Sequence, residues 1–119
     1  MSDSREIVMY SRSFGCPFVS VAKRVFTDFA LGYREIMIDK DADAKARVLA
    51  WTGFQSVPTL VIAEAGSDYP IEEPAPLPRG TSPRGIDRGY MLTEPSHAEL
   101  TAWLVKHGFI SSADSAEAE

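Results

Sequence analysis

The sequence predicts one α/β domain with elements in the order strand, helix, strand, helix, strand, strand, helix, and with helices on both faces of a sheet. Two observations indicate this fold class. Short apolar runs end at Gly, Pro or Ser, as buried strands do, and between them apolar residues recur at helical spacing. The chain has 119 residues, of which 45 % are hydrophobic, so it can bury one compact core.

The first strand and helix are predicted within residues 7–32. Residues 7–10, IVMY, form an apolar run that is too short for a helix and therefore predicts a strand. Pro17 suits the first position of a helix, and Gly32 is expected to end that helix. The apolar face of this helix is predicted to contain Phe18, Ala22, Val25 and Phe29.

A second strand and helix repeat the pattern. Residues 33–38 are rich in β-forming side chains, and acidic residues at 39–43 precede a second helix, which Gly53 is expected to close. The third strand, residues 59–63, follows Pro58, which lacks an amide hydrogen and fits the start of a strand. The apolar face of the second helix is predicted to contain Ala44, Val48 and Trp51.

The last strand and helix lie near the C-terminus. Residues 89–92 predict the final strand. Ser96 and Glu99 have the spacing of a capping box, and Gly108 is placed to end the helix that they begin. The apolar positions of this helix are Leu100, Trp103 and Leu104.

The domain is predicted to span residues 1–110 and to carry a long Pro-rich loop, residues 64–88, before the last strand. Residues 111–119 form an acidic tail that we expect to be disordered. A loop of this length is either functional or mobile. Acidic residues occupy its first half and arginines its second half, so its ends are expected to attract each other or to present a basic patch. A solvated excursion is the preferred interpretation, and docking of a protein partner is the alternative. The prolines of the loop are Pro70, Pro74, Pro76, Pro78 and Pro83.

The charge balance limits the classes of partner. The chain has 12 Lys and Arg against 17 Asp and Glu, a net charge of -5, so its surface repels nucleic acid. It has no apolar run of membrane-spanning length and no signal-peptide pattern, and we therefore expect neither membrane insertion nor secretion. A single cysteine cannot form an internal disulfide, which together with the missing signal predicts a cytoplasmic location.

That cysteine, Cys16, lies between the first predicted strand and the first predicted helix. The free amide hydrogens and the positive end of a helix stabilise a thiolate over a thiol, and Arg12 adds a positive charge nearby. A lone cysteine is most often a small buried residue, but glycine before it and proline after it suit exposure of its side chain. The position therefore predicts a reactive thiol.

Three segments resemble the glutaredoxin family. Residues 10–19, YSRSFGCPFV, are similar to its active-site segment, residues 33–39, YREIMID, to its second strand, and residues 52–59, TGFQSVPT, to its Thr-Gly-x-x-Thr-Val-Pro segment. The resemblance covers residues 7–63 well. It implies a thioredoxin-like fold, a four-stranded mixed sheet flanked by three helices.

The resemblance also implies which residues act. Cys16 would be the catalytic thiol, and glutathione would be the co-substrate, acting on glutathionylated proteins or small-molecule disulfides. The Val57–Pro58 peptide would be cis and would face the thiol, while Arg12 and Gln55 would hold the glycine carboxylate of glutathione. The full set of implied glutathione-binding residues is Arg12, Pro17, Phe18, Gln55, Val57, Pro58 and Thr93.

Two departures from the family pattern affect the mechanism. Val19 stands where a dithiol member has its second cysteine, which leaves a monothiol route on glutathione mixed disulfides. The Gly-Gly pair that precedes the final helix in the family has no clear match in residues 89–96, GYMLTEPS, although Thr93 or Ser96 would supply contacts there. Without that pair, glutathione has fewer expected contacts.

Other interpretations stay open. The chain is alternatively a catalytically silent binding module of the same fold, or a glutathione transferase-like domain, which residues 57–60 also resemble. A 2Fe–2S cluster, as in monothiol relatives, is a less favoured alternative, because one thiol per chain requires a dimer and external ligands. His97 and His107 lack partners at metal-ligand spacing and are interpreted as exposed or capping residues. The larger aromatic side chains, Phe18, Phe26, Phe29, Trp51 and Trp103, are assigned to the core.

Overall fold

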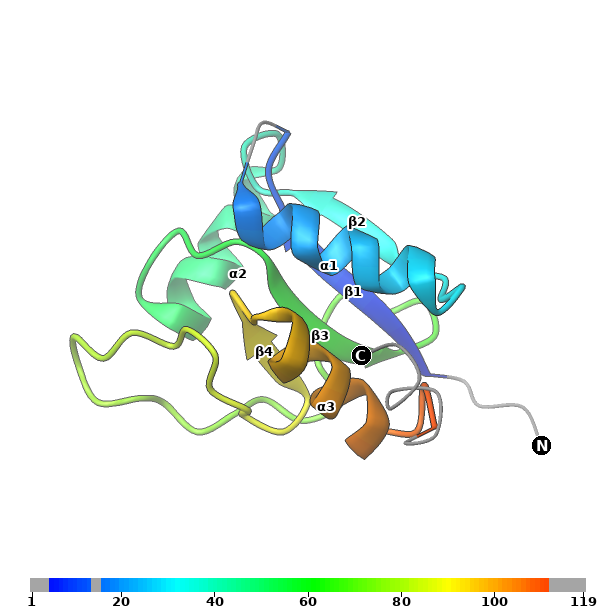
Figure 1. Cartoon of the computed structure of the whole chain (residues 1–119). Helices are drawn as coiled ribbons and strands as arrows, with labels where there is room; N and C mark the ends of the chain where they lie inside the picture. The colour runs from blue at the N-terminus through cyan, green and yellow to red at the C-terminus, as the bar shows by residue number, and fades with distance from the viewer. Residues whose placement is uncertain (1–4, 14–15, 112–119) are drawn as a thin grey trace.

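A computed structural model describes residues 5–13 and 16–111 of the chain (Figure 1). Its four strands form one mixed sheet in the order β2-β1-β3-β4. The central strand β1 is parallel to β2 and antiparallel to β3, and β4 runs antiparallel to β3. The strands are β1 (Arg5–Ser11), β2 (Arg34–Met37), β3 (Thr59–Glu64) and β4 (Met91–Thr93).

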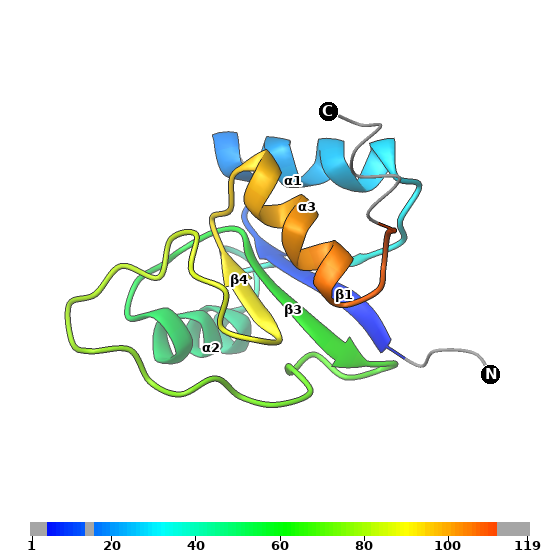
Figure 2. The ribbon, with the colours of Figure 1, turned by 60° about the horizontal axis from the view of Figure 1, so that its bottom comes forward.

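Three helices cover the two faces of the sheet. Helices α1 (Pro17–Asp28) and α3 (His97–Lys106) lie together on one face, and α2 (Ala42–Thr52) lies on the other (Figures 1 and 2). Element order, strand directions and helix placement confirm the predicted thioredoxin-like arrangement. Within the described residues, no helix is long and apolar enough to span a membrane.

The core is formed by the two central strands and the helix faces that pack on them. Val8, Met9 and Tyr10 in β1 are fully buried, as are the side chains of β3 from Thr59 to Ala63. Phe26, Trp51 and Trp103 are buried as predicted, but Phe18 and Phe29 are only partly buried. The prediction therefore placed these two side chains deeper in the core than they lie.

Helix α1 differs from its prediction in its buried face and in its end. The buried positions are Val19, Ala22, Val25 and Phe26. The helix is therefore rotated about its axis relative to the prediction, and Phe18 lies at the edge of the buried face. The helix ends at Asp28 and not near Gly32, because the chain reverses at Ala30, which takes a left-handed φ of 53°. The amide of Leu31 then bonds the carbonyl of Phe26 at 2.8 Å.

The predicted Gly53 end of α2 and the predicted capping box of α3 are confirmed, and Asp41 is the N-cap of α2. The Asp41 side chain accepts hydrogen bonds from the amides of Asp43 and Ala44, and Gly53 closes α2 with a left-handed φ of 79°. Ser96 and Glu99 form the capping box of α3. These ends are set by local contacts, which is why the sequence pattern is sufficient to predict them.

The first half of the Pro-rich loop, residues 64–88, is held against the domain. Arg34 forms an ion pair with Asp68 at 2.8 Å, and the Tyr10 hydroxyl donates to the Asp68 carbonyl. The amide of Ile71 bonds the carbonyl of Ile62 at 2.9 Å. The start of the loop is therefore attached to strands β1, β2 and β3.

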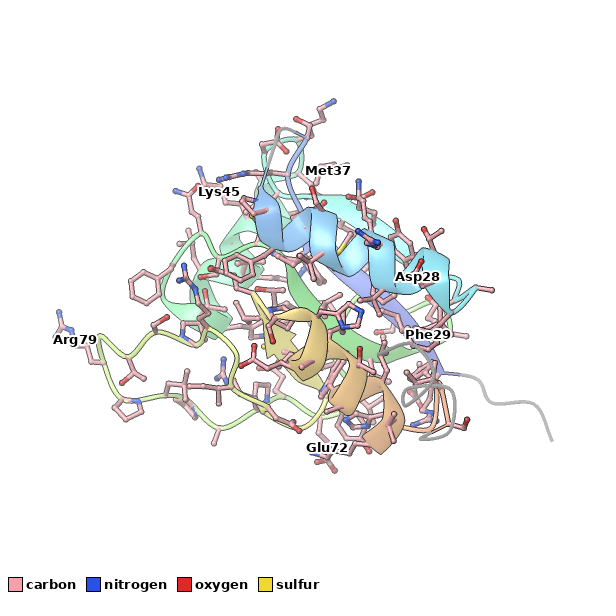
Figure 3. All side chains as sticks on the ribbon, viewed as in Figure 1. Asp28, Phe29, Met37, Lys45, Glu72 and Arg79 are labelled. Carbon is pink, nitrogen blue, oxygen red and sulfur yellow. The ribbon has the colours of Figure 1, made fainter. Side chains whose placement is uncertain are left out.

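The second half of the loop is attached as well. Arg88 donates to the carbonyls of Trp51, at 2.7 Å, and Ala75, at 2.9 Å, and so links the loop to the end of α2. Arg84 pairs with Glu94. The expected attraction between the two ends of the loop is thus replaced by contacts with the body of the domain. At the tip, exposed Arg79 points away from the domain (Figure 3).

Strand β4 begins at Met91, two residues later than Gly89, where the prediction placed it. Gly89 has a left-handed φ of 87° and belongs to the turn before the strand. Residues 112–119 of the predicted tail lie outside the described part of the chain.

Candidate active site

Cys16 lies at the start of α1, where the sequence placed it. It is the N-cap residue of the helix, with an extended backbone, and Pro17 occupies the first helical position. The carbonyl of Cys16 accepts the first helical hydrogen bond, from the amide of Ser20 at 3.1 Å. The thiol is partly buried, and its sulfur lies 3.3 Å from the carbonyl oxygen of Val57.

The electrostatic setting of the thiol is that of a helix N-terminus. The Cys16 side chain makes no capping hydrogen bond, and the first turn of α1 has no acidic residue. The first amide hydrogens of a helix have no partners within it and form its positive end, which stabilises an anion. The Cys16 sulfur thus lies at the positive end of α1, with no carboxylate in the same turn.

Val57 and Pro58 form the wall opposite the thiol. Their peptide bond is cis, as the resemblance implied, and both residues are buried. The Thr59 hydroxyl donates to the Ser56 carbonyl at 2.9 Å, and the amide of Glu94 donates to the Pro58 carbonyl at 2.8 Å. Contacts on both sides thus hold the Val57 carbonyl next to Cys16.

A hollow of about 450 Å³ lies between the end of β1 and the start of α2. Arg12 and Gln55, the two residues predicted to hold a carboxylate, both line it, so the fold brings together the residues that the resemblance paired. Lys40 and Lys45 add two further cations. The hollow is lined by Arg12, Ile38, Asp39, Lys40, Asp41, Ala42, Lys45 and Gln55.

The two carboxylates in this lining already accept hydrogen bonds from other groups of the protein. Asp41 caps α2. Asp39 accepts hydrogen bonds from the backbone amide and the hydroxyl of Ser13, and the hydroxyl bond holds the pKa of Asp39 below its ordinary value. The hollow therefore offers more cationic than anionic groups to a ligand, which favours a bound carboxylate.

The other predicted binding residues have different surroundings. Pro17 is exposed beside the thiol, and Phe18 is half-buried. The Thr93 side chain is fully buried, with its hydroxyl 3.3 Å from that of Thr59. The Thr93 hydroxyl is thus turned into the interior, and a contact from Thr93 to a ligand would have to come from its backbone.

Sequence reasoning missed one residue near the site, Arg84. Its guanidinium lies 5.0 Å from the centre of the Phe18 ring, two residues beyond Cys16 in the chain. Arg84 comes from the Pro-rich loop, and no spacing pattern or motif marks it in the sequence. Its position follows from tertiary contacts, so a sequence pattern has no signal for it.

His107 is the C-cap residue of α3, which agrees with its interpretation as an exposed or capping residue. Its ring is half-buried between Trp103 and Tyr90, and its Nε2 lies 2.8 Å from the Gly89 carbonyl. Burial lowers the pKa of His107 below its ordinary value. In the described ranges, no three His, Cys, Asp or Glu side chains are grouped so that they would hold a metal ion.

Comparisons with known proteins address the family. The family model described as Glutaredoxin matches residues 7–65. Glutaredoxin-C4, chloroplastic, from Oryza sativa subsp. japonica is 29 % identical over 62 residues, which cover 50 % of this chain and 46 % of that protein. The chain therefore spans about half the length of this curated relative. No solved structure matches the chain. The matched segment contains Cys16, Gln55, Val57 and Pro58, and with it this chain belongs to the glutaredoxin family.

Proposed function

We propose that the protein is a thiol–disulfide oxidoreductase that uses Cys16 alone, by a monothiol mechanism, on glutathione mixed disulfides. One observation carries the proposal. The Cys16 sulfur lies at the N-terminus of α1, 3.3 Å from the Val57 carbonyl, and Gln55, two residues before Val57 in the chain, lines a hollow together with Arg12. This arrangement favours a thiolate and offers cationic groups to an anionic substrate on one side of it.

In the first step, the Cys16 thiolate attacks the glutathione sulfur of a mixed disulfide. A bond forms between the Cys16 sulfur and the glutathione sulfur, the original disulfide bond breaks, and the substrate leaves as a thiolate that takes a proton from water. The positive end of α1 stabilises the attacking thiolate. The Val57 carbonyl contacts the sulfur in the resting thiol, and by the family resemblance the Val57 backbone would pair with the cysteinyl part of glutathione.

In the second step, a second glutathione thiolate attacks the glutathione sulfur on Cys16. Glutathione disulfide is released, and the Cys16 thiolate is regenerated, so each cycle consumes one free glutathione, and the glutathionyl group of the substrate becomes the other half of the glutathione disulfide. Val19 stands where a second thiol would act, and its side chain is buried in the core. An internal disulfide is therefore unavailable, and an external thiol must complete the cycle.

The hollow supplies recognition of the glutathione half. The Arg12 guanidinium and the Gln55 amide both carry N–H donors, and Lys40 and Lys45 strengthen the positive field. We assign the glycine carboxylate of glutathione to this hollow. The cytoplasmic location and the 2Fe–2S alternative stay predictions.

Turnover of a glutathione mixed disulfide by the Cys16→Ser variant tests the proposal. We expect the rate to fall to that of the reaction without protein, because the hydroxyl of serine is not ionised near neutral pH. Ser20→Ala, an exposed change on the same helix, is the matched control and should keep the rate. Full activity of the Cys16→Ser variant would contradict the proposal.

A non-catalytic binding module is the second candidate. The buried hydroxyl of Thr93 favours it, since this side chain is withdrawn from the glutathione site that the resemblance assigned to it. The same assay separates the two functions. A wild-type chain that turns over no glutathione mixed disulfide would leave the binding module as the better candidate.

A further inference from the structure

We propose that Arg84, a residue of the Pro-rich loop, binds a carboxylate of the disulfide substrate on the β4 side of Cys16 and so determines substrate specificity. This inference rests on the proposed function and deepens it. It adds a second anion-binding group to the site, opposite the hollow that contains Arg12.

A chain of contacts places Arg84 at the rim of the site. Its guanidinium stacks on the Phe18 ring at 5.0 Å, and Phe18 belongs to the first turn of α1, which Cys16 caps. Its backbone forms a bridge with Thr93, at the end of β4. Figure 2 shows the returning part of the loop alongside β4. The loop therefore delivers this arginine to the thiol end of the sheet.

Glu94 fixes the orientation of Arg84. The Nε and Nη2 atoms of Arg84 lie 3.0 and 2.9 Å from the same carboxylate oxygen of Glu94. The amide of Glu94 is in turn bonded to the carbonyl of Pro58, next to the Val57 carbonyl that contacts the thiol. Arg84 is thus tied to both walls of the site, through Phe18 to α1 and through Glu94 to Pro58.

The guanidinium still has donors to offer. It carries five N–H groups, and the pair with Glu94 occupies one side of the fork. The side chain of Arg84 is 61 % exposed, whereas that of Glu94 is 15 % exposed. An ion pair so open to water is weak, so Glu94 orients the arginine without cancelling its attraction for an anion.

The two cationic groups lie on different sides of Cys16. Arg12 lines the hollow at the start of α2, beyond the end of β1, whereas Arg84 lies against β4 and α1. A disulfide with carboxylates at both ends would meet a guanidinium at each end. A neutral or cationic substrate would gain less, which makes charge the property that the site selects.

The first experiment measures the field at the thiol without any turnover. Cys16 is the chain's single cysteine, so alkylation reports on it alone. Iodoacetate and iodoacetamide react with the same thiolate and differ in charge, so the ratio of their rates cancels the reactivity of the thiolate itself. We expect Arg84→Gln to lower the iodoacetate-to-iodoacetamide ratio about threefold at low salt.

Two variants serve as controls for this ratio. Arg79→Gln removes the same charge from the exposed tip of the same loop and should leave the ratio unchanged. Arg84→Lys keeps the charge and should recover most of the ratio, which a merely structural role of Arg84 would not predict. Equal ratios for the Arg84→Gln and Arg79→Gln variants would overturn the proposal.

The second experiment identifies which half of the substrate carries the carboxylate. KM is measured for mixed disulfides of glutathione with 3-mercaptopropionate, an anion, and with 2-mercaptoethanol, which is neutral. If Arg84→Gln raises KM only for the mercaptopropionate substrate, the carboxylate belongs to the leaving half. If KM rises equally for both, it belongs to the glutathione half. Unchanged KM for both would again overturn the proposal.

The two experiments also separate this proposal from the proposed function. If the wild-type chain turns over neither disulfide but the alkylation ratio still responds to Arg84→Gln, the oxidoreductase function fails and the anion preference stands. If turnover is normal and neither readout responds to Arg84→Gln, the function stands and the role of Arg84 fails.

Discussion

The two sides of the Cys16 site differ in origin. The Arg12 side, which consists of Arg12, Gln55 and the hollow that they line, is built by segments inside the stretch that matches the family model. The Arg84 side, which consists of Arg84, Glu94 and the Phe18 ring, is built mainly by the Pro-rich loop and the end of β4, beyond that stretch.

If Arg84 acts as proposed, this difference shows how one fold acquires a new specificity. The thiol and its nearest backbone partner sit on the central strands and the helix that pack in the core, so their geometry follows from the fold. The loop adds a charged side chain, Arg84, at the rim of the site. Function in such folds is commonly carried by loops on a rigid scaffold.

The largest expected effect concerns the scaffold that both sides share. Leu60 in β3 is fully buried between β1 and β4, so Leu60→Ala should lower the free energy of unfolding by about 2–5 kcal/mol. Guanidinium denaturation measures this change. Leu49→Ala, on the 39 % exposed Leu49 of α2, should cost far less. Equal losses would mean that the sheet is not the common support.

The next prediction concerns the link between the loop and the body. Arg88→Met removes the donors that bind the carbonyls of Trp51 and Ala75, and we expect a loss of about 2 kcal/mol in the free energy of unfolding. Urea denaturation checks the value, with Arg79→Met as the matched change at the exposed tip. Identical stability of the two variants would show that the loop is held by other contacts.

A third prediction concerns substrate binding on the Arg12 side of the site. Arg12→Gln should raise KM for glutathione mixed disulfides about tenfold, the cost of one charge-assisted hydrogen bond, and should change kcat less. Steady-state kinetics separate the two constants. Arg24→Gln, whose side chain is 81 % exposed on α1, is the control. A fall in kcat alone would assign Arg12 to the chemical step.

The smallest effect is a pH dependence far from the thiol. Burial lowers the pKa of His107, so the unfolded chain binds a proton at this residue more readily than the folded chain does. Stability should therefore decrease as the pH falls below about 6.5, the ordinary pKa of histidine. Lys106, Asp87 and Arg5 are the charged neighbours of the ring.

Urea unfolding at pH 7, 6 and 5 measures this dependence. The His107→Gln variant should lose stability less steeply over the same range, because glutamine does not titrate. Parallel curves for the two proteins would contradict the assignment to His107.

Local signals predicted the fold and the family resemblance paired Arg12 with Gln55, but long-range contacts decided the rest. The Gly53 end and the capping box at Ser96 involve residues close in sequence, and both were predicted correctly. The predicted end of α1 was wrong because the chain reverses at Ala30, which adopts a backbone conformation that favours glycine. Arg84 was missed because its contacts join residues far apart in the chain.

Because both halves of the Pro-rich loop are attached to the domain, its tip is the part most open to a protease. Arg84 and Arg88 are held by carbonyls, a carboxylate or a ring, whereas Arg79 stands exposed at the tip beside Gly80. A trypsin-like protease would therefore nick the loop after Arg79 first. The two fragments would stay together, since β3 remains paired with β4 and α1 packed against α3. The nicked domain would thus consist of two complementing pieces, one with β1 to β3, α1, α2 and the thiol, and the other with Arg84, β4 and α3.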